Sequence, residues 1–318
     1  MYYFKTLYIF LIFIALNLFF FSTVNVSAKS FQVDEIEISE PFKEKFDKNL
    51  VIDKGFRNAF FKLINLLVKS NDFNKVKSIR LNEIKSMIES FTIQEEKFID
   101  QTYYLKIGVN FDKRKIYNYL EKKNIFPSQI KIEKFLFLPL IIDENNDDII
   151  VYADNPLYEK WNLDSNKNYL INYLLPTEDL EDINFIKKNI DNIENYNFEE
   201  IIKKYFLNNS IISIIFKSKK EIKVLSKIYI KDKEIILNNS FKSYDFNNKE
   251  ELNLFINELK IIYEDLWKKQ NEINTSIKLP LIIKIDNQNL GISLKIENIF
   301  KEIDLISFYS IKNFDKDY

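Results

Sequence analysis

Long uninterrupted runs of apolar residues constrain the fold of this chain more than any other feature. Residues 134–143 (KFLFLPLIID) and 211–216 (IISIIF) are almost entirely apolar, and residues 169–176 (YLINYLLP) look similar. A strand that is apolar on both faces needs cover on both faces. Helical patterns lie between these runs, at residues 179–190 and 198–206. Buried strands that alternate with helices predict an α/β layer in the middle of the chain.

A long amphipathic helix is predicted to follow this layer. After a hairpin pattern at residues 221–237, apolar residues recur with helical spacing between Lys249 and Asn271, and this is the strongest helical period in the chain. Trp267 lies on the apolar stripe and Lys268 lies off it. We therefore expect truncation of Trp267 to open a cavity, and truncation of Lys268 to cost almost no stability.

The N-terminal part of the chain predicts an α+β module. Residues 31–39 and 101–112 alternate between apolar and polar side chains as half-buried strands do, with a bulge expected at Ile36. Residues 53–70 repeat with the spacing of a helix, and a short amphipathic helix is expected near Ile116. Strands and helices that are not regularly alternated are typical of the α+β class.

The last part of the chain predicts a small βαβ-like unit. Residues 277–285 and 304–311 read as strands, and a helix is expected near residues 292–300. The expected division of the whole chain is a signal peptide, an N-terminal α+β domain, a central α/β domain and this C-terminal unit, at residues 1–28, 29–130, 131–272 and 273–318.

The first 28 residues predict export. Lys5 precedes an apolar run from Leu7 to Phe21, and small residues follow, ending in Ala28. The run is shorter than the roughly 20 residues that a spanning helix needs. This length favours a signal peptide that is cleaved after Ala28 and a periplasmic mature protein; an uncleaved anchor is the alternative. The membrane is then a partner only through this segment before cleavage.

The composition removes several classes of function. The chain has no cysteine and no histidine, so it forms no disulfide, and the usual zinc, copper and iron–sulfur ligands are missing. Its glycines, Gly55, Gly108 and Gly291, are too far apart for a phosphate-binding loop. The net charge of −1 without a basic stripe argues against nucleic acid as a partner. We expect neither a metal nor another cofactor.

Four segments resemble a family of exported bacterial proteins filed as domain of unknown function 2066. They are DKGFRNAFFKLINLLV (53–68), YYLKIGVNFD (103–112), FLPLI with NPLYEKW (137–141 and 155–161), and LLPTEDLEDI (174–183). The resemblance extends from about Phe31 to the end of the long helix and rests on the order and spacing of all four segments. It implies an envelope protein of bacteria with two membranes, without an established activity and without catalytic residues.

The first candidate site is the stretch DNPLYEKWN (154–162). Asn155 and the following proline favour a turn, and Tyr158 and Trp161 are three residues apart, so that a short helix would place both aromatic rings on one side. One interpretation is that these three residues form a patch, with two aromatic rings, that receives a ligand or partner. The other is that Trp161 closes the core above the apolar strand. We favour the core, because buried aromatic residues are common.

The second candidate site is an acidic cluster at residues 177–184 (TEDLEDIN). Asp179, Glu181 and Asp182 follow an expected strand, at the edge where α/β sheets bind ligands. A binding site or a carboxylate pair is one interpretation. A capped helix is the interpretation that we favour, because acidic residues stabilise the first turn of a helix. A further acidic run, residues 143–148, is expected to be a solvated loop.

The sequence leaves three functions open. We favour an exported envelope protein that acts by binding an unknown envelope protein or small ligand, as an assembly or accessory factor and not as an enzyme. The second is a hydrolase, such as a glycosidase, that uses Asp179 with Glu181 or Asp182; such a pair needs an open gap of about 5–9 Å between its carboxyl groups. The third is a solute-binding protein with a deep cleft lined by Tyr158 or Trp161.

Overall fold

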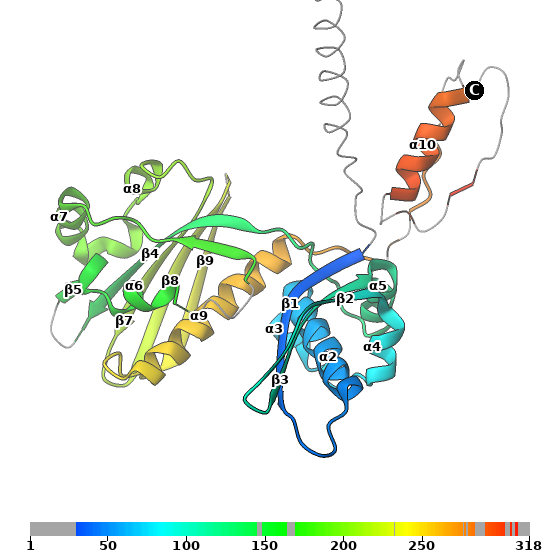
Figure 1. Cartoon of the computed structure of the whole chain (residues 1–318). Coiled ribbons are helices and arrows are strands. Elements are labelled where there is room, and N and C mark those ends of the chain that lie inside the picture. Colours follow the sequence, from blue (N-terminus) through cyan, green and yellow to red (C-terminus); the bar gives the residue numbers. More distant parts are fainter. Residues whose placement is uncertain are drawn as a thin grey trace, which may run out of the picture.

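The structure, a computed structural model, describes residues 30–144, 148–163, 169–231, 233–275, 277, 279–283, 290–302, 306 and 309–310. The expected signal peptide lies outside the described residues. Two separate sheets with helices packed on them confirm the expected mixture of α+β and α/β architecture. Figure 1 shows the two sheets as two bodies connected through the middle of the chain.

The N-terminal sheet has three antiparallel strands in the order β1-β3-β2. Its elements are β1 (Ser30–Pro41), α2 (Lys48–Leu67), α3 (Ser70–Phe73), α4 (Leu81–Met87), β2 (Ile88–Ile99), β3 (Thr102–Asp112) and α5 (Lys113–Lys122). The bulge expected in the first strand is confirmed by a register shift between Val33 and Ile36. Strand β2 was not predicted, because nearly all of its side chains are exposed and show no buried face.

Helix α2 covers one face of this sheet and builds the first core. The buried side of β3, which includes Leu105, Ile107 and Val109, faces the buried side of α2. Gly55 lets the helix approach closely, because a Cβ atom there would lie 2.5 Å from a methyl carbon of Ile107. Apolar burial on this single face is what holds the small sheet to its helices.

The central sheet has six strands in the order β5-β4-β7-β8-β9, with β6 paired to β4. The strands are β4 (Glu133–Asp143), β5 (Asp148–Ile150), β6 (Ile171–Leu174), β7 (Asn209–Lys217), β8 (Glu221–Ile230) and β9 (Lys233–Lys242). Strand β4 runs parallel to β6 and β7, and the other pairs are antiparallel. The apolar runs at 134–143 and 211–216 are confirmed as the two most buried strands, β4 and β7.

Helices cover both faces of the central sheet (Figure 1). Helix α9 (Lys249–Gln270) packs on one face together with α6 (Pro156–Trp161). The opposite face carries α7 (Leu180–Lys188), α8 (Glu199–Lys203) and the 3₁₀ segments η1 (Tyr152–Asp154) and η2 (Ile190–Asn195). The two faces form two separate apolar clusters, so β4 and β7 contribute side chains to both.

Several polar side chains of α9 are buried as well as its apolar stripe. Tyr263 shares hydrogen bonds with the buried hydroxyls of Ser213 and Ser226, at 3.0 and 2.8 Å. The Glu264 carboxylate accepts the backbone N–H groups of Leu170 and Ile171 at the start of β6. Burial raises the pKa of the Glu264 carboxyl, whereas these two backbone bonds lower it. The helix is therefore held by directional bonds on the flanks of its stripe.

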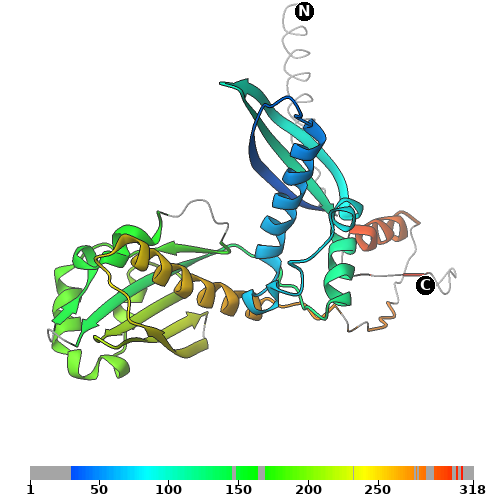
Figure 2. The ribbon, with the colours of Figure 1, turned by 90° about the horizontal axis from the view of Figure 1, so that it is seen from below.

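The end of α9 also joins the two bodies (Figure 2). The ammonium group of Lys268 donates to the carbonyl of Val68, directly after α2, at 3.1 Å. Lys69 and Glu272 form an ion pair at 2.9 Å, and the backbone N–H of Ser70 donates to the carboxylate of Asp265 in α9 at 2.9 Å. The expectation that Lys268 is dispensable is therefore wrong: the N-terminal domain covers the flank of α9 that a solitary amphipathic helix would expose.

The C-terminal part contains helix α10 (Leu290–Glu302). The strand expected at residues 277–285 is not formed at the residues described there, Ile277 and Leu279–Ile283, whose side chains are exposed. An apolar sequence forms a strand only where it pairs with a neighbouring strand. Most of the strand expected at residues 304–311 lies outside the described residues. Over the described part of the chain, no helix has the length and apolar character needed to cross a membrane.

We predict that Lys268→Ala lowers the free energy of unfolding by about 1–3 kcal/mol, because the carbonyl of Val68 loses its donor and the buried Glu264 carboxylate loses a nearby positive charge. Lys269→Ala, one residue further along and exposed, serves as the control and should change stability by less than about 0.5 kcal/mol. Urea unfolding of both variants measures the difference. Equal midpoints would contradict the role of Lys268 at the junction.

Candidate functional site

Asn155 occupies a gap beside β4. On this side of the strand, β6 pairs with Glu133–Leu136 and β5 pairs with Ile141–Asp143, and neither pairs with Pro139. The buried amide of Asn155 donates to the carbonyl of Pro139 at 3.0 Å, and its oxygen accepts the backbone N–H of Leu157, which caps α6. Both functional groups of Asn155 are thus used inside the fold, so it offers no group to a ligand in this structure.

Trp161 lies inside the core. None of its surface is exposed (0%), and its ring stacks on Phe137 of β4 with 3.9 Å between the centroids. Lys260 of α9 donates to the Trp161 carbonyl and lies 5.4 Å from the centre of the indole ring. Trp161 therefore connects β4, α6 and α9, in agreement with the interpretation that it closes the core.

Tyr158 and Trp161 do not share a face, in contrast to the expectation from their spacing. Trp161 belongs to the cluster under α9, whereas Tyr158 packs against the cluster on the other side of the sheet. Helix α6 lies at the interrupted edge of β4. The two sides of this helix therefore contact the apolar clusters on opposite faces of the sheet. The ring of Tyr158 is 5.8 Å from that of Tyr152, and burial raises the pKa of both phenols well above their usual range.

The acidic cluster joins the start of α7 to the end of α8 through hydrogen bonds and ion pairs, and we call this group of contacts the bonded corner. Asp179 caps α7 by accepting the backbone N–H groups of Glu181 and Asp182, at 2.8 and 3.4 Å. The ammonium group of Lys204 bridges the carboxylates of Asp179 and Asp182, at 2.8 and 2.7 Å. The hydroxyl of Tyr152 donates to Asp182 at 3.3 Å. The capped helix, which we favoured from the sequence, is confirmed.

The electrostatics of this corner suit a structural role. The Lys204 ammonium lowers the pKa of the Asp179 carboxyl, and both aspartates raise the pKa of Lys204. One ammonium nitrogen contacts both carboxylates, so Lys204 occupies the space between them. A glycosidase needs that space open for a sugar or a water molecule. In the described parts of the chain, no group of three or more acidic side chains is arranged to hold a metal ion.

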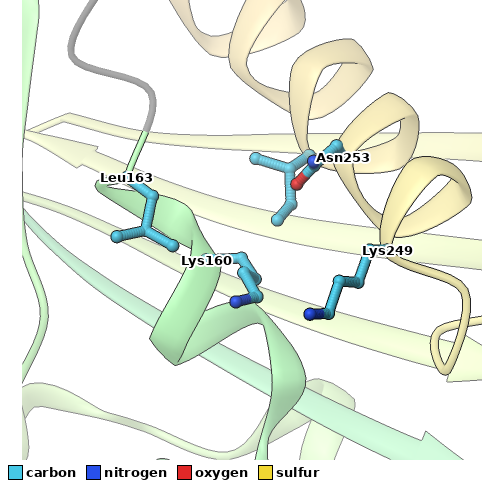
Figure 3. A pocket seen from close by; sticks show the side chains of 5 residues that line it. Lys160, Leu163, Lys249 and Asn253 are labelled. Atoms are coloured by element: carbon cyan, nitrogen blue, oxygen red, sulfur yellow. The ribbon is translucent and has the colours of Figure 1, made fainter.

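A small pocket of about 180 Å³ lies between α6 and the start of α9, and neither Tyr158 nor Trp161 lines it. Figure 3 shows Lys160 and Lys249 reaching toward the same opening from the two helices, with Leu163 and Asn253 beside them. Lys160 pairs with the neighbouring Glu159 at 3.2 Å. The sequence did not single out this pocket. One signal was present: Lys249 places a positive charge at the positive end of a long helix.

An exposed aromatic cluster lies at one end of the N-terminal domain. We call it the tip cluster and define it as Phe42, Phe46, Phe98 and Ile99, from the β1–α2 loop and the β2–β3 hairpin. The rings of Phe42 and Phe98 are 4.8 Å apart, and so are those of Phe42 and Phe46. Phe42 is 49% exposed and Phe98 is 58% exposed. This cluster was not predicted from the sequence, because its members come from two segments that are distant in the chain.

Comparisons with known proteins give no further support for any site. No protein-family model matches the chain, and no curated protein matches its sequence.

We predict that Asp182→Ala destabilises the protein by about 1–3 kcal/mol, because Lys204 and the buried hydroxyl of Tyr152 both lose an acceptor. Glu181→Ala removes the neighbouring, exposed acidic residue and should stay within about 0.5 kcal/mol of the parent protein. Thermal and urea unfolding of the two variants test this. If Asp182→Ala were as stable as Glu181→Ala, the bonded corner would not contribute to the fold.

Proposed function

We propose that this chain is an exported protein of the bacterial envelope that acts by binding a partner protein, as an assembly or accessory factor. The tip cluster is the observation that carries this proposal. When a partner covers aromatic side chains that are half exposed and touch one another, the burial of their apolar surface favours binding. Aromatic residues, Phe among them, are also enriched at protein interfaces relative to the rest of the surface.

The charges around the tip cluster favour a protein over a lipid surface. Glu95, Glu96 and Asp100 lie in or beside the same hairpin, together with Lys97 and the lysines of the β1–α2 loop. Membrane surfaces attract segments that are predominantly basic. A rim of both signs around an apolar centre is instead the usual pattern of a protein interface.

Export is supported by the sequence of residues 1–28 and by the resemblance of the four quoted segments to an exported family. The absence of cysteine is compatible with export, because the buried cores of both domains supply stability without disulfides. The hydrolase alternative has less support, because Lys204 forms ion pairs with Asp179 and Asp182, and each pair proposed for it includes Asp179.

Solute binding is the second candidate function, and the pocket beside α6 favours it. Two ammonium groups beside the apolar side chains of Leu163 and Ile256 suit a small anion with an apolar part. The pocket is shallow and its lining side chains Leu163 and Lys249 are exposed, so it gives a ligand little burial. We therefore rank it after partner binding.

We predict that the mature protein begins at Lys29. A signal peptidase would cleave after Ala28, following the small residues that end the apolar segment. N-terminal sequencing of protein from the periplasmic fraction measures this directly. Recovery of chains with intact Met1 only in the membrane fraction would show an anchor instead, and recovery in the cytoplasm would refute export.

We predict that the tip cluster is needed to retain a partner. The tagged full chain, expressed in cells that produce it naturally, should retain a specific envelope protein that Phe98→Ser loses. Phe206→Ser is the matched control, because Phe206 is 93% exposed and lies outside the tip cluster, after α8. Quantitative mass spectrometry compares the proteins retained by the parent, by Phe98→Ser and by Phe206→Ser.

The proposal fails if Phe98→Ser retains the same proteins as the parent, or if the loss occurs with Phe206→Ser instead. Melting curves of both variants accompany the capture. Since both side chains are largely exposed, neither substitution should lower the melting temperature by more than a few degrees.

A further inference from the structure

Strand β9 forms an open edge of the central sheet. It pairs with β8 on one side, in a register that runs from Lys233 to Lys242 without a shift. The opposite edge ends in β5, which has three residues, and the edge strands β1 and β2 of the other sheet both contain register shifts. Short length and bulges protect an edge from pairing with another strand. Among the strands that the structure describes, β9 combines a long edge with neither protection.

The sequence of β9 also lacks charge where an isolated edge usually carries it. Between Glu234 and Lys242 the strand reads IILNNSF, with no charged residue. Ile236 is 56% exposed on the face away from α9. An uncharged, regular and partly apolar edge is a template for a further strand.

We propose that two copies of this chain associate through β9, with the two strands antiparallel and related by a two-fold axis at Asn238. In this register Glu234 of each copy lies opposite Lys242 of the other. Ile235 lies opposite Phe241, and Leu237 lies opposite Asn239. The sequence of β9 is thus complementary to itself in charge at both ends, which is the condition for a two-fold symmetric interface.

The alternation of side chains along β9 agrees with this register. Ile235, Leu237 and Phe241 point toward the cluster under α9 and are partly buried there, whereas Glu234, Ile236 and Lys242 are exposed on the other face. A two-fold axis perpendicular to the sheet keeps each residue on its own face, so the apolar pair Ile235–Phe241 extends the existing core. A register shifted by two residues in either direction breaks both Glu234–Lys242 pairs.

Glu234 and Lys242 have only surface contacts within one copy. Glu234 accepts a hydrogen bond from Tyr229 at 2.9 Å through one carboxylate oxygen, and Lys242 lies 5.0 Å from the ring centre of Tyr244. A carboxylate accepts several bonds and an ammonium group donates three. Both side chains can therefore keep these contacts and also reach across the axis.

Cross-linking through a single cysteine tests the register, because the full chain has no cysteine of its own. Residues directly opposite each other in an antiparallel pair have Cα atoms about 4.5–5.5 Å apart, which allows a disulfide. Asn238→Cys should therefore give a disulfide-linked dimer under mild oxidation. Ser240→Cys is the matched control: its two copies lie about 13 Å apart along the strands, so it should stay uncross-linked.

Charge reversal tests the same pairing without a covalent bond. Glu234→Lys or Lys242→Glu alone places like charges opposite each other twice, and should weaken the dimer roughly fivefold or more in sedimentation equilibrium. The double variant Glu234→Lys with Lys242→Glu restores both pairs and should dimerise as the parent does. Unchanged melting temperatures at low concentration show that all three variants fold.

A parent chain that is monomeric at tens of micromolar overturns the proposal. So does a dimer in which Asn238→Cys and Ser240→Cys cross-link equally, or in which neither does. If the double variant dimerises no more tightly than the single variants, the pairing of Glu234 with Lys242 is refuted. Since the tip cluster lies on the other domain, loss of the dimer leaves the capture experiment with Phe98→Ser unaffected, and the two proposals fail separately.

Discussion

The central domain depends on β4, a strand that is buried on both faces and has a proline in its middle. The N–H and C=O groups of one residue point to the same side of a strand, and the carbonyl of Pro139 points to Asn155. The missing N–H therefore lies on the side where neither β5 nor β6 pairs with Pro139. On the other side β4 pairs with β7 over its length from Leu136 to Asp143. The proline is tolerated because it falls in the interruption of one ladder.

This interruption explains the first candidate site. Asn155 supplies the hydrogen bond that a neighbouring strand would have supplied, and by capping α6 it fixes a short helix at the open edge of β4. Trp161 then stacks on Phe137 under α9, while Tyr158 packs on the opposite layer. The turn, the aromatic residues and the buried amide look like a binding motif in the sequence, yet each has a function in closing the fold. The surfaces that we propose for partners lie elsewhere, on the tip cluster and on β9.

The elements with strong periodicity were predictable, and those defined by their surroundings were not. The apolar runs became β4 and β7, and the long helical stripe became α9 with bounds within one residue of those expected. Strand β2 was missed, because exposed residues on an edge strand have no burial pattern. The run at 169–176 shortened to β6, of which only Ile171 is buried, and the run at 277–285 did not become a strand in its described residues, because apolar composition does not specify a pairing partner.

Residue types and their spacing are enough to predict the class of fold, the two-sided cover of the central strands and the absence of cysteine and histidine chemistry. These follow from residue type and spacing within one segment. Only the tertiary fold shows where the polar groups find their partners: Lys268 at the junction with Val68, Glu264 at the start of β6, and Lys204 between Asp179 and the buried Asp182. It also decided that Phe42 and Phe98 form one surface. The physical reason is that these contacts join segments distant in the chain, and the pattern of one segment carries no information about which other segment will cover it.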